Sequence, residues 1–280
     1  VAVAVMLAIV CVTVGFGQKA KPAQKAPKQI IFAVLSDGKS LEPIAYLEKG
    51  KLEQTVNGSD SADILAAFAK TYYKTGTKYD LVFGGASAGT VTVKSANNKY
   101  ECAPNTANVT VSAAKANLRG NVMGLATNAP VKNTTIERRR PTVIERREVE
   151  SLVNGIYATN KLTPKTLNSQ NLTVLDVDNN GRPDFVGSYC IDVDKSTRAL
   201  VFFIAEKGSD GKIRVTYNDF RMIDQADVMS GDIKDVDNGI YHELLLDAFD
   251  YDGDGHGEIF TYTASFEGAG FTAYKKVGDK

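Results

Sequence analysis

Two short acidic motifs are the residues of this sequence best suited to chemistry. The first reads Asp-Val-Asp-Asn-Asn-Gly-Arg-Pro-Asp over residues 176–184, and the second reads Asp-Tyr-Asp-Gly-Asp-Gly-His-Gly-Glu over residues 250–258. Both place oxygen-bearing side chains at positions 1, 3, 5 and 9 and a glycine at position 6. Such oxygens converge when a loop wraps around a hard cation, and glycine permits the sharp turn that this requires. The pattern therefore predicts two calcium sites.

Each motif supplies a set of candidate ligands. Positions 1, 3, 5 and 9 offer side-chain oxygens, and the residue at position 7 offers its backbone carbonyl. The candidates are Asp176, Asp178, Asn180, Arg182 and Asp184 in the first motif and Asp250, Asp252, Asp254, His256 and Glu258 in the second. The second motif has four carboxylates against three in the first, so we expect it to bind calcium more tightly, with both dissociation constants at about 10⁻⁴–10⁻³ M. The competing interpretation is a pair of metal-free Asx turns.

The surrounding residues distinguish between classes of calcium loop. An EF-hand needs glutamate at position 12 and a helix on each side, whereas these motifs have Gly187 and Thr261 there and strand-like flanks. The motifs instead resemble the calcium loops of FG-GAP and VCBS-type repeats of integrin-like and bacterial extracellular proteins, which implies structural calcium between strands. The chain lacks their Phe-Gly signature, and its two motifs lie further apart than the roughly 40–50 residues of a propeller blade. A closed propeller is therefore not expected.

The elements that must position these loops are mostly strands. Residues 30–115 contain strand-like runs and one amphipathic segment, which predicts a small α+β or mainly β domain. Residues 116–142 are polar and are expected to connect it to a β-rich domain over 143–280 that carries both loops. The predicted fold class is α+β, mainly β, with antiparallel strands and one helix packed on the second sheet.

Helix and turn signals divide these domains further. Apolar residues at helical spacing predict a helix over 61–74. Thr142 and Glu145 match a capping box, which predicts that a second helix runs over 143–159. The glycine-rich stretch 84–89 lacks the Lys-Ser/Thr of a phosphate-binding loop and is expected to be a hairpin connection.

The N-terminal residues predict export. Residues 1–17 carry no charge and resemble a signal peptide, either cleaved or retained as an anchor. Residues 18–29 hold four lysines, two prolines and no carboxylate, which is typical of a flexible linker. Cys11 would leave with the signal, so that Cys102 and Cys190 either pair as a disulfide or remain two separate thiols. The expected location is secreted, periplasmic or at the cell surface.

Composition limits the function classes. Equal numbers of basic and acidic residues, 33 of each, argue against a nucleic-acid partner. With two histidines and no Gly-x-Ser-x-Gly elbow, we do not expect an enzyme. The rival interpretation is an extracellular hydrolase that uses carboxylates, as glycoside hydrolases do.

The expected partners are calcium and an extracellular protein or glycan, with no membrane span after signal cleavage. Four aromatic residues near the C-terminus either line a carbohydrate-binding patch or pack in the core: Tyr262, Phe266, Phe271 and Tyr274. The stretch 258–276 also resembles the C-termini of secreted bacterial proteins. That resemblance identifies no activity.

Overall fold

A computed structural model describes residues 26–114, 116–131 and 138–277. The expected signal peptide lies outside these residues, as do residues 18–25 of the expected linker. The strands are β1 (Gln29–Leu35), β2 (Ser40–Glu48), β3 (Lys51–Gln54), β4 (Lys78–Phe83), β5 (Ala86–Ala96), β6 (Ala107–Ala113), β7 (Gly124–Thr127), β8 (Asn168–Leu175), β9 (Asp184–Asp192), β10 (Thr197–Lys207), β11 (Ile213–Asp224), β12 (Glu243–Phe249), β13 (Glu258–Ala264) and β14 (Ala269–Tyr274). The α-helices are α1 (Ala62–Tyr72), α2 (Val143–Thr159) and α3 (Lys234–Asp237). The expected fold class, α+β and mainly β with antiparallel strands, is confirmed, and the described strands form no closed propeller.

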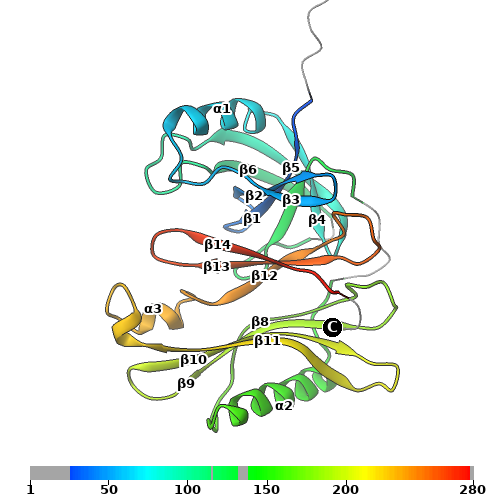
Figure 1. Cartoon of the computed structure of the whole chain (residues 1–280), viewed down its shortest axis with the longest axis vertical. Helices are drawn as coiled ribbons and strands as arrows, with labels where there is room; N and C mark the ends of the chain where they lie inside the picture. The colour runs from blue at the N-terminus through cyan, green and yellow to red at the C-terminus, as the bar shows by residue number, and fades with distance from the viewer. Residues whose placement is uncertain (1–25, 115, 132–137, 278–280) are drawn as a thin grey trace, which may run out of the picture.

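The first sheet is a barrel. Its strands follow the order β1-β7-β4-β5-β6-β2, and a further pairing of β1 with β2 closes the ring, with β3 added beside β2. Helix α1 covers one end of the barrel (Figure 1) because its aromatic residues Phe68 and Tyr72 pack in the barrel core with Phe32. Strand β7 comes from the segment 116–142, which was expected to connect two domains and instead contributes to this sheet.

The second sheet carries the long helix. Strands β11-β10-β9-β8 are all antiparallel, and α2 packs on one face through Val149, Val153 and Tyr157. The predicted capping box at the start of α2 is confirmed. The Thr142 side chain accepts a hydrogen bond from the Glu145 N–H at 3.2 Å, and the Glu145 carboxylate accepts one from the Thr142 N–H at 2.7 Å. This short-range signal defines where the helix begins.

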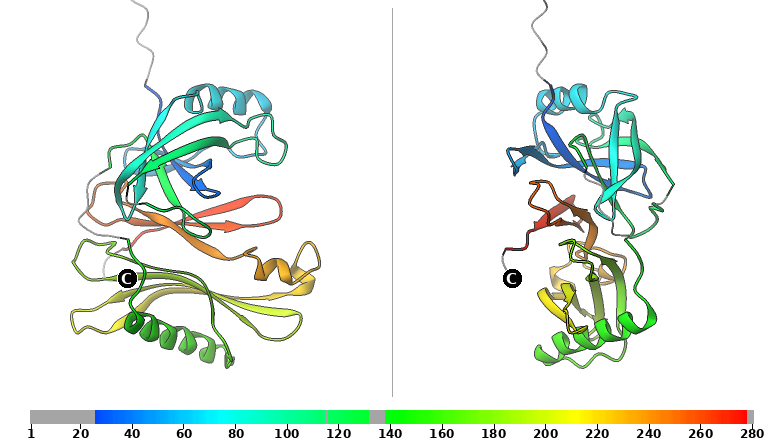
Figure 2. Two further views of the ribbon diagram at one scale, coloured as in Figure 1. Left: turned by 180° about the vertical axis from the view of Figure 1, so that it is seen from behind. Right: turned by 90° about the vertical axis from the view of Figure 1, so that its right-hand side faces the viewer.

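The third sheet, β12-β13-β14, lies between the other two (Figure 2). Strand β12 is buried along its whole length. Leu244 and Leu246 pack with residues of the barrel, whereas Leu245 and Ala248 pack with residues of the four-stranded sheet. A strand that is covered on both faces carries a nearly continuous apolar run rather than an alternating one, which explains the sequence of β12. The middle sheet thus joins the two layers into one stack.

The two remaining cysteines are separate thiols, the second of the two alternatives that the sequence left open. Cys102 is an exposed free thiol in the loop before β6, and Cys190 is a buried free thiol in β9. Burial raises the pKa of the Cys190 thiol to about 12. The disulfide is absent because Cys102 lies in a loop of the barrel whereas Cys190 lies in a strand of the four-stranded sheet, a separation that an even cysteine count cannot reveal. Among the described residues, no helix is long and apolar enough to cross a membrane.

The capping carboxylate of α2 predicts a loss of stability in acid. The Arg139 guanidinium, which holds both Glu145 oxygens at 2.7–2.8 Å, lowers the pKa of Glu145 to about 2 from its ordinary value of 4.5. Because the folded-state pKa is the lower one, this contribution is present above about pH 4.5 and is lost as the pH falls toward about 2. We expect it to amount to about 1–2 kcal/mol, since Arg139 is partly exposed.

Urea unfolding of wild type and Glu145→Gln at about pH 5 and about pH 3 tests this expectation. The glutamine keeps the capping hydrogen bond but cannot titrate, so the variant should lose less stability between the two pH values than wild type. Glu148→Gln, an exposed carboxylate on the same helix, serves as the control. Equal acid sensitivity of wild type and Glu145→Gln would contradict the prediction.

Candidate metal centre

The first acidic loop, which we call loop A (residues 176–184), connects β8 to β9. The Asp176 carboxylate accepts hydrogen bonds from the N–H groups of Asn180 at 3.0 Å and Gly181 at 2.7 Å. Gly181 has a φ of +77°, a left-handed conformation that glycine adopts without strain. The loop therefore turns back on its first aspartate, as its sequence predicts. Asn180 accepts the Arg182 N–H through its side-chain oxygen.

The second acidic loop, loop B (residues 250–258), connects β12 to β13 in the same manner. The Asp250 carboxylate accepts hydrogen bonds from Gly253 at 2.7 Å and Gly255 at 3.2 Å, and Asp254 accepts one from His256 at 2.9 Å. In loop A the residue at position 9, Asp184, accepts the N–H of position 2 at 2.7 Å, and in loop B Glu258 does so at 3.4 Å. The two loops therefore share a hydrogen-bonding scheme as well as a sequence.

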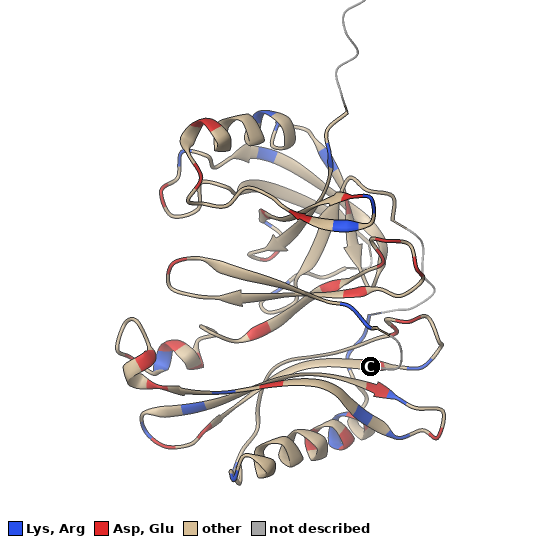
Figure 3. Cartoon of the chain, in the orientation of Figure 1, with Lys and Arg blue, Asp and Glu red and all other residues tan. Residues whose placement is uncertain are grey.

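The two loops lie against each other, although they are far apart in the sequence. The Asn179 side chain donates a hydrogen bond to the Gly255 carbonyl at 2.8 Å, and the Gly257 N–H donates one to the Val177 carbonyl at 2.7 Å. A cavity of about 20 Å³ beside them is lined by Asp176 and Asp250, the first residues of the two loops. A cavity of this volume accommodates one water molecule. Figure 3 draws acidic residues in red, and such segments occur in the loop that follows β8 and in the loop that follows β12.

Loop A contains a buried carboxylate, that of Asp184, with one oxygen that lacks a hydrogen-bond partner among the described residues. Asp184 is only 3% exposed, and its Oδ1 atom has no hydrogen-bond partner among the described residues. Burial raises the pKa of Asp184 to about 7, and the negative charges of Asp178, Glu206 and Asp176 act in the same direction. A buried carboxylate oxygen without a partner is costly. A cation placed among these oxygens would remove that cost.

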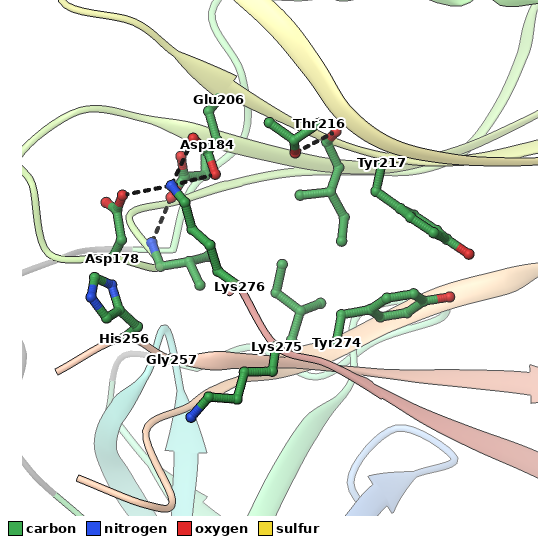
Figure 4. A pocket seen from close by; sticks show the side chains of 13 residues that line it. Asp178, Asp184, Glu206, Thr216, Tyr217, His256, Gly257, Tyr274, Lys275 and Lys276 are labelled. Atoms are coloured by element: carbon green, nitrogen blue, oxygen red, sulfur yellow. Dashed lines mark hydrogen bonds and ion pairs between the residues drawn. The ribbon is translucent and has the colours of Figure 1, made fainter. Parts of the chain in front are cut away.

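A lysine and a glutamate that the motif did not predict complete the surroundings of loop A. The Lys276 ammonium lies 3.2 Å from the Asp178 carboxylate and 2.8 Å from that of Glu206 (Figure 4). Glu206 reaches this position because β10 pairs with β9 in a register that aligns Glu206 with Asp184. Only that pairing could have identified Glu206, since it lies outside the motif.

Lys275 occupies the corresponding place at loop B. Its ammonium pairs with the Asp252 carboxylate, lies 2.8 Å from that of Asp254 and lies 3.1 Å from Glu258 Oε1. The contact with Glu258 is an ion pair without hydrogen-bond geometry, so Oε1 keeps no hydrogen-bond partner among the described residues. Successive side chains of an extended chain point to opposite sides, and this alternation lets Lys275 and Lys276 reach different loops.

A buried ion pair between Arg138 and Asp247 lies beside the loops. The sequence did not predict it. Asp247 is fully buried, and its carboxylate accepts hydrogen bonds from the N–H groups of Gly84 and Gly85, both at 2.9 Å. These glycines form the two-residue turn between β4 and β5, which confirms the expected hairpin connection. Arg138 Nη1 lies 2.8 Å from Asp247 Oδ2. The glycine-rich stretch therefore binds an anionic group, which is the Asp247 side chain of the same protein.

The predicted ligands divide into two groups in space. The carboxylates that lie close enough together to hold a metal ion are Asp176, Asp178 and Asp184 in loop A and Asp250, Asp252 and Asp254 in loop B. In each group, one oxygen from every residue lies within 4.8 Å of the others. The Arg182 side chain is not a ligand, since its Nε donates a hydrogen bond to the Lys207 carbonyl. Only its backbone carbonyl is a candidate ligand.

The arrangement can hold one metal ion at each loop, with hard oxygen ligands from carboxylates. Comparison with known proteins gave no matching family model, no similar curated protein and no similar solved structure.

Proposed function

We propose that this chain is an exported calcium-binding protein in which calcium fixes the two loops between strands. The observation that carries the proposal is the unpartnered Oδ1 of Asp184, which is buried at the base of loop A beside Asp176 and Asp178. Hydrogen bonds within the loop account for the other oxygen of Asp184 but leave this one without a donor. A cation is the ligand that an unpartnered, buried carboxylate favours.

The ligand chemistry favours calcium over other metals. The candidate side-chain ligands at positions 1, 3, 5 and 9 are all oxygens, and neither loop contains cysteine, so metals that require thiolate have no ligand here. Calcium accepts six to eight oxygens in flexible geometry, whereas magnesium demands a nearly ideal octahedron. Loops that present oxygens at alternate positions together with a backbone carbonyl suit the first requirement better. The backbone carbonyls of Arg182 and His256 are the proposed ligands at position 7.

The position of the loops supports a structural role for the ion. Loop A joins two strands of the four-stranded sheet, loop B joins two strands of the middle sheet, and the loops are bonded to each other. A calcium ion at each loop would therefore stabilise the contact between two layers. The resemblance of the motifs to FG-GAP and VCBS-type loops supports the same role and an extracellular location.

Thermal unfolding with EDTA, millimolar calcium or millimolar magnesium tests this proposal. Ligand that binds only the folded state stabilises it by RT ln(1 + [L]/Kd), which at 1 mM calcium and the expected dissociation constants amounts to about 0.4–1.4 kcal/mol for each site. We therefore expect calcium to raise the melting temperature and magnesium to raise it less. No shift in either metal would contradict the proposal and would leave both loops as metal-free turns.

Asp184→Asn separates metal ligation from ordinary packing. The asparagine retains an oxygen for the Val177 N–H but removes the buried charge, so the variant should be at least as stable as wild type in EDTA and less stabilised by calcium. Asp250→Asn should have the corresponding effect at loop B. Asp194→Asn, which changes an exposed aspartate of a hairpin turn, is the matched control. If Asp194→Asn reduced the calcium response as much as the loop variants, the effect would not reside in the loops.

A further inference from the structure

A second cavity lies away from both acidic loops, between the barrel and the β13–β14 hairpin. It measures about 740 Å³. It opens where one edge of β2 changes partners. That edge pairs with β6 only at Ser40 and Leu41 and with β3 only from Ala45 onward, which leaves residues 42–44 without a partner on this edge among the described strands. On the other edge, Glu42 and Pro43 pair with β1. The cavity is thus a gap in the sheet that the loops around residues 54–59 and 101–105 surround.

The polar residues that line this cavity are either acidic or uncharged, and none of those described is basic. Glu42, Glu101 and Glu267 line it, and no lysine, arginine or histidine is found among its described lining residues. Glu42 lies on the unpaired edge of β2 and is partly buried. Burial raises the pKa of the Glu42 carboxyl, and a hydrogen bond with Asn105 opposes this. An anionic ligand would therefore meet only repulsion here, whereas hydroxyl donors would find carboxylate and amide acceptors.

The opposite wall is aromatic. Tyr262 on β13 and Phe271 on β14 are directly paired across the two strands, and their ring centroids lie 6.0 Å apart. Both rings are only partly buried against the core and line the cavity. Burial raises the pKa of the Tyr262 phenol, and the charge of Glu42 acts in the same direction. The other two aromatic residues of the expected patch lie elsewhere: Phe266 packs against Tyr241, and Tyr274 lines the pocket beside loop A.

We propose that this cavity binds a carbohydrate that carries no acidic group. A pyranose ring presents hydroxyl groups around its edge and carbon-bound hydrogens on its faces. The hydroxyl groups match Glu42 and Asn105, and an apolar face matches Tyr262 and Phe271. The absence of basic lining residues excludes sialylated, sulfated and uronic-acid sugars by charge. This inference is independent of the calcium proposal, because the cavity shares no lining residue with either loop.

The experiment is a glycan array that carries neutral and acidic oligosaccharides, probed with the full chain, followed by calorimetric titration of a neutral oligosaccharide that binds. Glu42→Gln and Tyr262→Ala should each weaken its binding about tenfold or more, because one removes a charged acceptor and the other a stacking surface. Glu53→Gln, an exposed carboxylate on β3 outside the cavity, should bind like wild type.

Two outcomes would overturn the proposal. One is the absence of saturable binding to any neutral oligosaccharide on the array, and the other is binding that Glu42→Gln leaves unchanged. Glu42→Gln is nearly isosteric, so it tests the proposal even if Tyr262→Ala does not fold. Asp250→Asn should bind the sugar like wild type, with or without EDTA, and this result separates the sugar site from the calcium sites.

Discussion

Replacing Arg138 with methionine is expected to lower the free energy of unfolding by about 3–5 kcal/mol, because it leaves the buried Asp247 carboxylate without its counter-ion. The side chains of Arg138 and Asp247 are 3% and 0% exposed. Arg138 also donates hydrogen bonds to the carbonyls of Met123 and Leu246, at 2.8 and 2.7 Å. Its guanidinium lies 4.5 Å from the centre of the Phe83 ring. One side chain therefore connects the barrel to β12.

Urea denaturation of wild type and Arg138→Met measures this effect. Arg146→Met is the control, because its ion pair with Glu150 is partly exposed and 3.8 Å long, and such pairs contribute about 1 kcal/mol or less. The double variant Arg138→Met with Asp247→Asn should be less destabilised than the sum of the single variants, since no charge is then left buried. A loss for Arg138→Met no larger than that for Arg146→Met would show that the buried pair is unimportant.

The second large effect concerns calcium affinity. Lys275→Gln should tighten calcium binding at loop B about tenfold, since calcium must otherwise displace an ammonium from Asp252, Asp254 and Glu258. Lys276→Gln should act in the same direction at loop A by freeing Asp178. Both expectations rest on the calcium proposal. They follow from competition between two cations for one set of carboxylates.

Calcium titration calorimetry measures these affinities. Each lysine variant is combined with Asp184→Asn or Asp250→Asn, so that one site remains to be titrated. Lys70→Gln, an exposed lysine on α1, controls for the change in net charge. Unchanged or weaker binding in Lys275→Gln would mean that the lysine does not compete with the metal. In the absence of lysine substitutions, we still expect loop B to bind more tightly than loop A.

Features that depend on neighbouring residues were predictable from the sequence. The helix over 143–159 follows from its capping box and apolar stripe, and the turns of both acidic loops follow from glycine and aspartate spacing. The dominance of antiparallel strands followed from alternating and apolar runs. In each case, the interactions that form the structure lie within about ten residues, and such local preferences are visible in the order of the residues.

Only the tertiary structure decided which distant residues meet. Strand register places Glu206 beside Asp184. After β14, successive side chains point to opposite sides, so Lys275 and Lys276 contact different loops. A gap in the pairing of β2 opens the cavity at Glu42. The same reason explains why the sequence left the pairing of Cys102 and Cys190 open and why the place of β7 in the barrel was not expected. The sequence determined which loops can bind a cation. The fold decided what competes for that cation, because ion pairs and buried carboxylates depend on sheet packing rather than on sequence spacing.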